Sequence, residues 1–314
     1  MTTQVLVLDH NAEDYLPALR RSFPDLHVDS SRPGDELRAN PAEIEVLIAF
    51  GLGVNDDLMR SMTALKWIHS LATGVDYFLR LPSLPERVLL TSGRGIHGPP
   101  MRETVLFLMQ AVSRKVTSLA ANRKEHRWER RRWPLLAGKT AVIAGVGISS
   151  TATAGLLKAL GMRVVGVSRT PREVAGFGAV VHFNQLATMA AEADYLIDML
   201  PGGPHNVGAV GKTVLAAMKP SAYFINVGRG DTVDDAALVE CLREKRIAGA
   251  ALDVFRQEPL PPDDPFWHLP NVFITSHTAG YFEEYAEHAL PIILDNMQHF
   301  LDGRSEKMLN LVKR

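Results

Sequence analysis

KTAVIAGVGISSTATAGLLKALGMRVVGVSRT, residues Lys139 to Thr170, is the stretch of sequence that decides the fold. Its apolar run from Ala141 to Ala144 is typical of a strand that is buried on both faces. Gly145 and Gly147 follow this run, and the small residues from Thr151 to Leu160 then indicate a helix. The order of strand, glycine turn and helix predicts the first part of a βαβ unit.

The same stretch continues past Gly161, a residue type that commonly ends a helix. Val164 to Val167 form a second apolar run, which predicts a strand ending at Ser168 and Arg169. Because a glycine turn at a helix N-terminus lets the backbone approach a pyrophosphate, we expect a dinucleotide site here. The glycine pattern is incomplete, since Ser150 occupies its third position, and an ordinary βαβ unit is the alternative that these residues leave open.

The composition is that of a globular protein: 46% of the 314 residues are hydrophobic, 22% are charged, and the formal net charge is −1. This near-neutral charge argues against polyanion binding by the molecule as a whole, so we expect no nucleic-acid partner. A single cysteine, Cys241, excludes an internal disulfide and suits a reducing compartment. No apolar stretch approaches the roughly 18 residues of a membrane span, and the N-terminus lacks signal-peptide features, so we expect a cytoplasmic protein without membrane association.

Short apolar runs alternate with helix-like stretches along most of the chain, which predicts an α/β fold with parallel sheets covered by helices. The expected strands are Val5–Leu8, Val46–Ala49, Trp67–Ser70, Val88–Leu90, Ala141–Ala144, Val164–Val167, Ala179–Phe183, Tyr195–Leu200, Ala222–Val227, Ala248–Leu252 and Val272–Thr275. The expected helices are Glu13–Arg21, Asp56–Met62, Thr151–Leu160, Thr213–Met218, Asp235–Glu244 and Glu283–Leu301, of which the last should pack back on the first domain.

A further long helix is expected between the two halves of the chain. Residues from Met101 to about Arg127 contain no Gly or Pro, and their apolar positions recur at helical spacing. Six basic residues lie between Asn122 and Trp133, interleaved with tryptophans as in some nucleic-acid patches. Because Glu125 and Glu129 fall in the same run, we interpret it instead as a solvated helix end or part of a subunit interface.

Three motifs in the second half place a functional group directly after an apolar strand. Asn226 to Gly230 contains an arginine, Leu252 to Pro261 an aspartate and a glutamate, and Ser276 to Gly280 a histidine. In a parallel sheet such residues converge on the carboxyl edge, where ligands bind. Each motif alone has an ordinary explanation, such as a surface ion pair or a turn, but the three in this order are far more specific.

Together these motifs resemble those of the D-isomer-specific 2-hydroxyacid dehydrogenase family, over nearly the whole chain. The family patterns N-x-x-R-G, L-D-V-F-x-x-E-P-L-P and P-H-x-A-G are similar to the three motifs, with Ser276 in place of proline. Its glycine turn resembles Gly145–Gly147, and a G-V-D turn of its first domain resembles Gly74–Asp76. The resemblance implies two Rossmann-like α/β domains with doubly wound parallel sheets and a cleft between them. Residues 1–98 plus 283–314 would form a flavodoxin-like substrate-binding domain, and residues 99–282 a dinucleotide-binding Rossmann domain.

The resemblance also implies roles for individual residues. Reduction of a 2-oxo acid builds negative charge on the ketone oxygen, and His277 matches the family residue that donates a proton there. Glu258 matches the glutamate that orients this imidazole and favours its protonated form. Arg229 matches the arginine that holds the substrate carboxylate and polarises the ketone. Backbone N–H groups at Thr73 and Gly74 resemble those that bind the carboxylate from the first domain.

The remaining implied site residues bind the cofactor, and no metal site is expected. Asp253 resembles the residue that contacts the nicotinamide end, with a structural role as a strand-end cap as the alternative. The other implied cofactor contacts are Gly145, Gly147, Ile148, Ser149, Ser168, Arg169, Leu200, Pro201, Val227, Gly228 and Gly280.

The residues after the second strand of the opening stretch indicate which cofactor is preferred. NAD enzymes place an acidic residue about 20 positions past the glycine turn, to hold the ribose hydroxyls. This chain has Ser168-Arg169-Thr170 there, with Arg172 close by, and such groups bind a 2′-phosphate. We therefore expect NADP(H), as in the glyoxylate and hydroxypyruvate reductase branch. The alternative is NAD(H), with Arg169 only stacking on the adenine.

The sequence thus predicts an NADP(H)-dependent, homodimeric reductase of a small 2-oxo acid, which is glyoxylate, hydroxypyruvate or a bulkier acid. Apolar residues that could line the pocket or equally belong to the core are Phe50, Leu52, Leu71, Tyr281 and Phe282. An alternative of another class is a corepressor-like NAD(P) sensor with little turnover. A formate or phosphite dehydrogenase is a further alternative, although the formate enzymes have Gln where this chain has Glu258.

Overall fold

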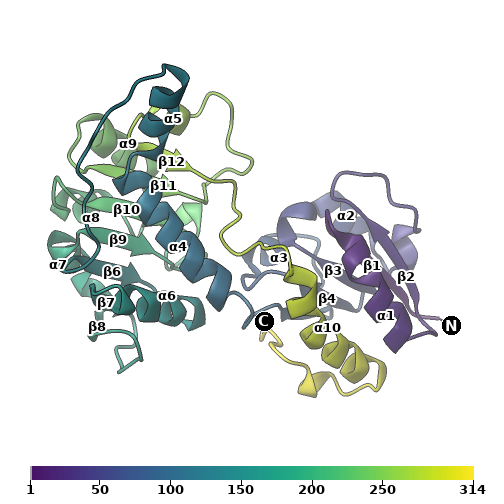
Figure 1. Ribbon diagram of the computed structural model, residues 1–314. Helices are drawn as coiled ribbons and strands as arrows, with labels where there is room; N and C mark the ends of the chain where they lie inside the picture. The colour runs from purple at the N-terminus through teal and green to yellow at the C-terminus, as the bar shows by residue number, and fades with distance from the viewer. Residues whose placement is uncertain (1) are drawn as a thin grey trace. The chain divides into compact units, whose positions relative to one another are not determined.

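The computed structural model describes residues 2–314, which divide into two compact units: residues 2–96 together with Glu283–Arg314, and His97–Phe282. Each unit is built on one parallel β-sheet with helices packed against it (Figure 1). The predicted α/β fold with two Rossmann-like sheets is therefore confirmed.

The first unit has a five-stranded parallel sheet in the order β2-β1-β3-β4-β5, which is the flavodoxin-like strand order. Its C-terminal helix α10 packs on this sheet: the Phe300 ring lies 5.4 Å from that of Trp67, and the Tyr285 ring lies 5.3 Å from that of Phe50. The strands are β1 (Gln4–Leu8), β2 (His27–Ser31), β3 (Val46–Ala49), β4 (Trp67–Ser70) and β5 (Leu89–Ser92). The α-helices are α1 (Leu16–Ser22), α2 (Asp56–Ser61), α3 (Asp76–Leu79) and α10 (Tyr285–Leu301).

The second unit has a seven-stranded parallel sheet in the order β12-β11-β10-β9-β6-β7-β8. This is the strand order of dinucleotide-binding folds with one strand added at an edge, and the direction of winding reverses between β6 and β9. The strands are β6 (Thr140–Ala144), β7 (Arg163–Ser168), β8 (Ala179–His182), β9 (Tyr195–Asp198), β10 (Tyr223–Asn226), β11 (Gly249–Leu252) and β12 (Val272–Ile274). The α-helices are α4 (Gly98–Ser113), α5 (Val116–Lys124), α6 (Ile148–Ala159), α7 (Leu186–Glu192), α8 (Lys212–Ala217) and α9 (Asp235–Arg243).

The apolar run of β6 is explained by cores on both faces of the second sheet. Ala141 and Ile143 pack into a cluster with residues of α4 and α6, whereas Val142 and Ala144 pack into a cluster with residues of α7, α8 and α9. A strand covered on both sides buries every side chain, so it shows a continuous apolar run rather than an alternating pattern.

The prediction of one unbroken helix from Met101 to about Arg127 is wrong. Helix α4 begins at Gly98 and ends at Ser113, Lys115 adopts a left-handed conformation with φ 54°, and α5 follows. The Ser113 hydroxyl donates to the Met109 carbonyl at 2.6 Å, an interaction that bends helices. Helix α5 buries only Asn122, so no apolar face holds the two segments in one straight helix.

Other departures from the predicted elements have local causes. Strand β2 was not predicted because it buries only Val28, and the short helix α7 because it buries only Leu186 and Ala190. The helix expected over Glu13–Arg21 is a 3-10 turn followed by the shorter α1, whose first turn contains Pro17. In the part of the chain that the structure describes, no helix is both long enough and apolar enough to cross a bilayer.

Candidate active site

The loops that carry the expected residues of the second unit leave its sheet at one edge. Six neighbouring strands end together, because five of them end, and β7 ends one residue later, in a single row of paired residues formed by Val167, Ala144, Asp198, Asn226, Leu252 and Ile274. This is the carboxyl edge of the sheet, and the row spans the point where the winding reverses. Open α/β sheets bind ligands at this position.

The glycine turn after β6 fits a pyrophosphate. Gly145 has φ 97°, and a Cβ there would lie 2.7 Å from the Met199 carbonyl oxygen, so a larger residue would clash with backbone. A Cβ at Gly147 would instead meet nothing within 4 Å. Helix α6 starts at Ile148, and N–H groups of a first helical turn have no acceptor within the helix. The N–H groups of Ile148 and Ser149 are therefore suited to bind an anion beside the open space at Gly147.

Ser150 occupies the third glycine position of the turn without distorting it. Its side chain is buried, and its hydroxyl accepts the Gly147 N–H at 2.6 Å while donating to the Gly147 carbonyl at 3.0 Å. The Ser150 side chain thus bonds to the backbone of the helix N-cap, Gly147, as the third residue of a capping box does.

The end of β7 is basic. The guanidinium of Arg169 lies over the Phe183 ring, 5.3 Å from its centroid, and its Nη2 donates to the His205 carbonyl at 2.7 Å and to the Asn206 side-chain oxygen. Arg172 reaches back to the glycine turn, where its Nη2 lies 3.4 Å from the Val146 carbonyl. Two guanidinium groups are thus attached to the same edge as the glycine turn.

The loops after β9 and β10 are in direct contact beside the glycine turn. Leu200 and Val227 are both buried, and a Cβ at Gly228 would lie 2.6 Å from the Leu200 carbonyl oxygen. Pro201 is exposed, and its carbonyl accepts from the Asn206 amide at 2.8 Å. Asn206 therefore connects the loop after β9 with Arg169.

Arg229 is held through its backbone. Its carbonyl accepts from the Asn226 side-chain amide at 3.2 Å and from the Thr232 hydroxyl at 2.5 Å. Its half-buried side chain donates from Nη1 to the Gly228 carbonyl at 2.9 Å. A Cβ at Gly230 would lie 1.9 Å from the backbone of Phe255, so the residue after the arginine must be glycine.

His277 and Glu258 form a pair. Nδ1 of the imidazole lies 2.7 Å from Oε2 of the carboxylate, and the two side chains are 25% and 12% exposed. The other carboxylate oxygen accepts the Phe255 N–H at 2.8 Å. His277 itself has φ 55°, a left-handed conformation that non-glycine residues adopt at an energetic cost and that is frequent at functional sites.

Asp253 holds the loop that carries His277. Its fully buried carboxylate accepts from the Thr275 hydroxyl at 2.6 Å and from the Thr278 and Ala279 N–H groups at 2.9 Å each. Its carbonyl accepts the His277 N–H at 2.7 Å. These bonds describe the strand-end cap that the sequence left as the alternative role of Asp253. Gly280 ends the same loop.

The two expected residues of the first unit, Thr73 and Gly74, lie in the turn between β4 and α3. The Ser70 hydroxyl donates to the Gly74 carbonyl at 3.2 Å, and the Tyr285 hydroxyl donates to the Leu71 carbonyl at 2.5 Å. Both bonds fix the backbone of this turn. The Leu71 side chain is fully buried, which favours the core alternative for that residue, whereas Leu52 and Tyr281 are 50% and 38% exposed.

Sequence reasoning missed four residues that support the site: Asp198, Asn206, Thr232 and Tyr285. The signal for Asp198 was available, since a charged residue interrupts the apolar run from Tyr195 to Leu200. The others hold backbone or side-chain groups of residues far from them in the chain, a relationship that spacing does not reveal.

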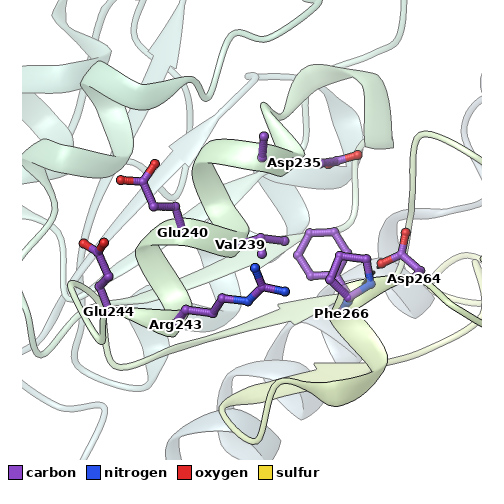
Figure 2. Close-up of a pocket in the computed structure, with 9 residues that line it drawn as sticks. Asp235, Val239, Glu240, Arg243, Glu244, Asp264 and Phe266 are labelled. Carbon is purple, nitrogen blue, oxygen red and sulfur yellow. Dashed lines mark hydrogen bonds between the residues drawn. The ribbon is translucent and has the colours of Figure 1, made fainter.

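A hollow of about 370 Å³ lies elsewhere in the second unit, between α9 and the segment Asp264–Phe266 (Figure 2). None of the expected site residues lines it. Four of the nine residues that line it are acidic, and burial raises the pKa of one of them, Asp235, to about 6. Within residues 2–314, the structure places no group of three or more His, Cys, Asp or Glu side chains where they could hold a metal ion.

Comparison with known sequences points to one family. Residues 106–279 match the family model of the D-isomer specific 2-hydroxyacid dehydrogenase, NAD binding domain. Over 277 residues the chain is 32% identical to a glyoxylate/hydroxypyruvate reductase B of Yersinia pestis (strain Pestoides F), which covers 85% of this chain and 84% of that protein. The D-3-phosphoglycerate dehydrogenases of Methanocaldococcus jannaschii and Archaeoglobus fulgidus are each 28% identical, and the chain spans only 59% and 58% of their length.

Solved structures agree with this match. A D-isomer specific 2-hydroxyacid dehydrogenase family protein from Aeromonas salmonicida superposes with a TM-score of 0.87 at 30% identity, covering 99% of each chain. An NADPH-dependent glyoxylate/hydroxypyruvate reductase from Sinorhizobium meliloti, solved in complex with NADP and sulfate, gives a TM-score of 0.83 at 28% identity over 99% of this chain and 98% of that one. The chain therefore belongs to the D-isomer specific 2-hydroxyacid dehydrogenase family.

Proposed function

We propose that this protein reduces a small 2-oxo acid to the corresponding D-2-hydroxy acid with NADP(H). The observation that carries the proposal is the His277–Glu258 hydrogen bond, formed at the same sheet edge as the glycine turn and Arg229. A dinucleotide turn alone would serve a sensor equally well. An imidazole oriented by a largely buried carboxylate is instead an arrangement suited to proton transfer.

In this proposal His277 is the general acid. Nδ1 donates a hydrogen bond to Glu258 and keeps its proton. The opposite nitrogen, Nε2, is therefore the one that protonates the ketone oxygen. The carboxylate stabilises the imidazolium before the transfer and fixes the plane of the ring. When bound, NADPH supplies the hydride that the ketone carbon accepts.

Arg229 is proposed to bind the substrate carboxylate and to polarise the ketone, since a guanidinium offers a rigid fork of donors. The backbone of this residue is fixed by Asn226 and Thr232, so its side chain starts from a defined position. The N–H groups of the turn at Thr73 and Gly74 are proposed as further donors to the carboxylate, and the proposed substrates are glyoxylate, hydroxypyruvate or a bulkier 2-oxo acid.

NADP(H) is the proposed cofactor. The glycine turn with Ile148 and Ser149 would hold the pyrophosphate, and Ser168 with Arg169 and Arg172 would hold the 2′-phosphate. Arg169 uses only Nη2 for its two hydrogen bonds among the described residues, so Nε and Nη1 can donate to a phosphate. The Sinorhizobium meliloti structure, which contains NADP, supports this assignment. Leu200, Pro201, Val227, Gly228, Asp253 and Gly280 are proposed to contact the remainder of the cofactor.

We also propose that the enzyme is a homodimer. Several apolar side chains on α4, α5 and the segment after α5 are exposed, among them Phe107 at 52%, Trp128 at 93% and Leu135 at 74%. A second copy of the chain would cover them. Light scattering should give twice the mass of one chain, and Trp128→Asp with Leu135→Asp should shift it toward that of a monomer. A wild-type mass of one chain at micromolar concentration would contradict this assignment.

The reaction is tested by following NADPH oxidation against a panel of 2-oxo acids, with His277→Asn as the inactive variant and the exposed His268→Asn as the matched control. Turnover that is lost only in His277→Asn supports the proposal. If the wild type binds NADPH but reduces no 2-oxo acid, the corepressor-like sensor is the better assignment. If His277→Asn is as active as the wild type, His277 is not the general acid.

A further inference from the structure

Asp198 is the last residue of β9 and lies in the register row between Ala144 and Asn226. Its side chain is fully buried, and one oxygen, Oδ1, accepts the Leu200 N–H at 2.9 Å. The other oxygen, Oδ2, lies 2.5 Å from the Thr232 hydroxyl. The proposed reaction makes no use of this carboxyl group, but Thr232 links it to the arginine motif, because the same hydroxyl also contacts the Arg229 carbonyl.

The Thr232 hydroxyl makes two short contacts and has one proton. Its oxygen lies 2.5 Å from Oδ2 of Asp198 and 2.5 Å from the carbonyl oxygen of Arg229. At these distances each contact needs a proton, because two acceptors with no proton between them repel each other. A carbonyl has no proton to give, so the hydroxyl proton points to Arg229. The proton between Thr232 and Asp198 must then belong to the carboxyl group.

We propose that Asp198 is a positioning residue that remains a neutral carboxylic acid. It donates a hydrogen bond to the Thr232 hydroxyl, and this hydroxyl donates in turn to the backbone carbonyl of Arg229. This proton chain would hold the segment from Gly228 to Thr232 in the conformation that presents the Arg229 guanidinium to the substrate carboxylate. In that last step the inference rests on the proposed function.

The surroundings of the carboxyl group agree with this protonation state. Burial raises the pKa of Asp198 to about 7, and the negative charge of Asp231 acts in the same direction, whereas the Leu200 N–H, and the Thr232 hydroxyl whenever it donates to the carboxylate, lower it. The residues beside Asp198 in the register, Ala144 and Asn226, do not titrate. Among residues 2–314, no positively charged side chain contributes to the pKa of Asp198.

Ionisation of Asp198 would change the acceptor to which the Thr232 hydroxyl donates its hydrogen bond. A carboxylate is a stronger acceptor than a carbonyl, so the hydroxyl would turn from Arg229 to Asp198. The Arg229 carbonyl would then keep the longer contacts to the Asn226 amide at 3.2 Å and to the Thr232 N–H at 3.3 Å. We therefore expect weaker binding of a substrate carboxylate as Asp198 ionises.

Four variants separate the proton chain from its structural background. Asp198→Asn keeps a donor toward Thr232 and cannot ionise. Thr232→Val breaks the chain at nearly constant volume, and Thr232→Ser restores the hydroxyl. Ser113→Ala is the matched control, because it removes another buried hydroxyl, which bonds to the Met109 carbonyl and not to the site.

Two measurements need no activity. The infrared spectrum of the wild type, minus that of Asp198→Asn, should show a protonated carboxyl group below the pKa of Asp198. Hydrogen exchange over residues 227–233 should be faster in Thr232→Val, and in the wild type above this pKa, than in Asp198→Asn at the same pH. Absence of the carboxyl band below the pKa, or equal exchange in Asp198→Asn and the wild type above it, would overturn the proposal.

The third measurement is the KM for glyoxylate with NADPH. Loss of one net hydrogen bond should raise KM about fivefold in Thr232→Val, with a smaller change in kcat, and leave Thr232→Ser and Ser113→Ala near the wild type. The wild-type KM should also rise with pH relative to that of Asp198→Asn. If the carboxyl band is present but these KM values coincide, Asp198 does not position Arg229. If the wild type reduces no 2-oxo acid, the proposed function fails, and the first two measurements still decide the proton chain.

Discussion

Nδ1 of His277 lies 2.7 Å from Oε2 of Glu258, although 19 residues separate the two in the chain. The second oxygen of the same carboxylate accepts the Phe255 N–H at 2.8 Å, so the carboxylate is held on both sides. This relationship fixes the imidazole ring and determines which nitrogen is available for proton donation.

His277→Asn should lower kcat by roughly 10²- to 10⁴-fold, because an amide cannot act as an acid at the ketone oxygen. Affinity for NADPH, measured by quenching of protein fluorescence, should stay within about twofold, since the loop that carries His277 is held by Asp253 rather than by the imidazole. A large loss of NADPH affinity in this variant would mean that the side chain supports the cofactor site instead.

Glu258→Gln should lower kcat by about 10- to 100-fold, because a hydrogen bond to a charged group contributes roughly 1.5–3 kcal/mol. As pH rises, kcat of the variant should also begin to decrease at a lower pH than kcat of the wild type, since the amide no longer stabilises the imidazolium. The pH profile of kcat is measured under saturating NADPH. A profile with unchanged position would show that Glu258 does not support His277.

Arg169→Asp should reverse or abolish the preference for NADPH over NADH, because a carboxylate repels a 2′-phosphate and accepts hydrogen bonds from ribose hydroxyls. We expect a change of at least about 100-fold in the ratio of the two kcat/KM values, equivalent to roughly 3 kcal/mol. Arg38→Asp, the same change at an exposed arginine of the first unit, is the control. An unchanged ratio in Arg169→Asp would favour the alternative in which Arg169 stacks on the adenine of NAD.

Asp198 should make stability depend on pH. Its pKa is raised from 3.8 to about 7 in the folded protein, so its neutral form stabilises the fold below about pH 4, and this contribution is lost as pH rises toward 7. Asp198→Asn lacks this loss. The free energy of unfolding of Asp198→Asn should therefore increase relative to that of the wild type between about pH 4 and pH 7, by on the order of 4 kcal/mol. Urea unfolding at a series of pH values measures it, and a constant difference would contradict the assignment.

Tyr285→Phe should weaken the turn that contains Thr73 and Gly74. The variant leaves the Leu71 carbonyl without its 2.5 Å hydrogen bond, at a cost of about 1–3 kcal/mol in the free energy of unfolding. We expect KM for the 2-oxo acid to rise several-fold with less change in kcat. Tyr223→Phe removes a hydroxyl from the second unit and serves as the control. Equal effects of the two variants on KM would exclude a specific role for Tyr285.

The sequence predicted the elements that are buried on both faces and the loops that follow them. The runs at β6, β7 and β9 are apolar because both sides of the sheet are covered, and such runs are visible without a structure. The failures occur where burial is slight: α5 buries only Asn122, and β2 only Val28. In such segments helix ends depend on local hydrogen bonds, such as the one from Ser113 to Met109, which periodicity does not report.

The candidate site was predictable to the extent that its residues follow strands. Register at the sheet edge brings the ends of β10, β11 and β12 together, so motifs separated by tens of residues could be grouped from the order of elements alone. What supports them was not predictable. The contacts of Asp198 with Thr232, and of Asn206 with Arg169, join loops whose conformations only the folded chain defines.

The arrangement of the site residues along one row of the sheet affects how the cofactor and substrate preferences of this protein can change during evolution. The groups proposed to choose the electron carrier follow β7, whereas those proposed to handle the proton follow β10, β11 and β12, and β6 and β9 stand between the two sets. Residues that share no contacts contribute independently, so substitutions on one side leave the other nearly unaffected. A lineage could therefore exchange NADPH for NADH, or one oxo acid for another, in separate steps, without passing through an intermediate that had lost both properties.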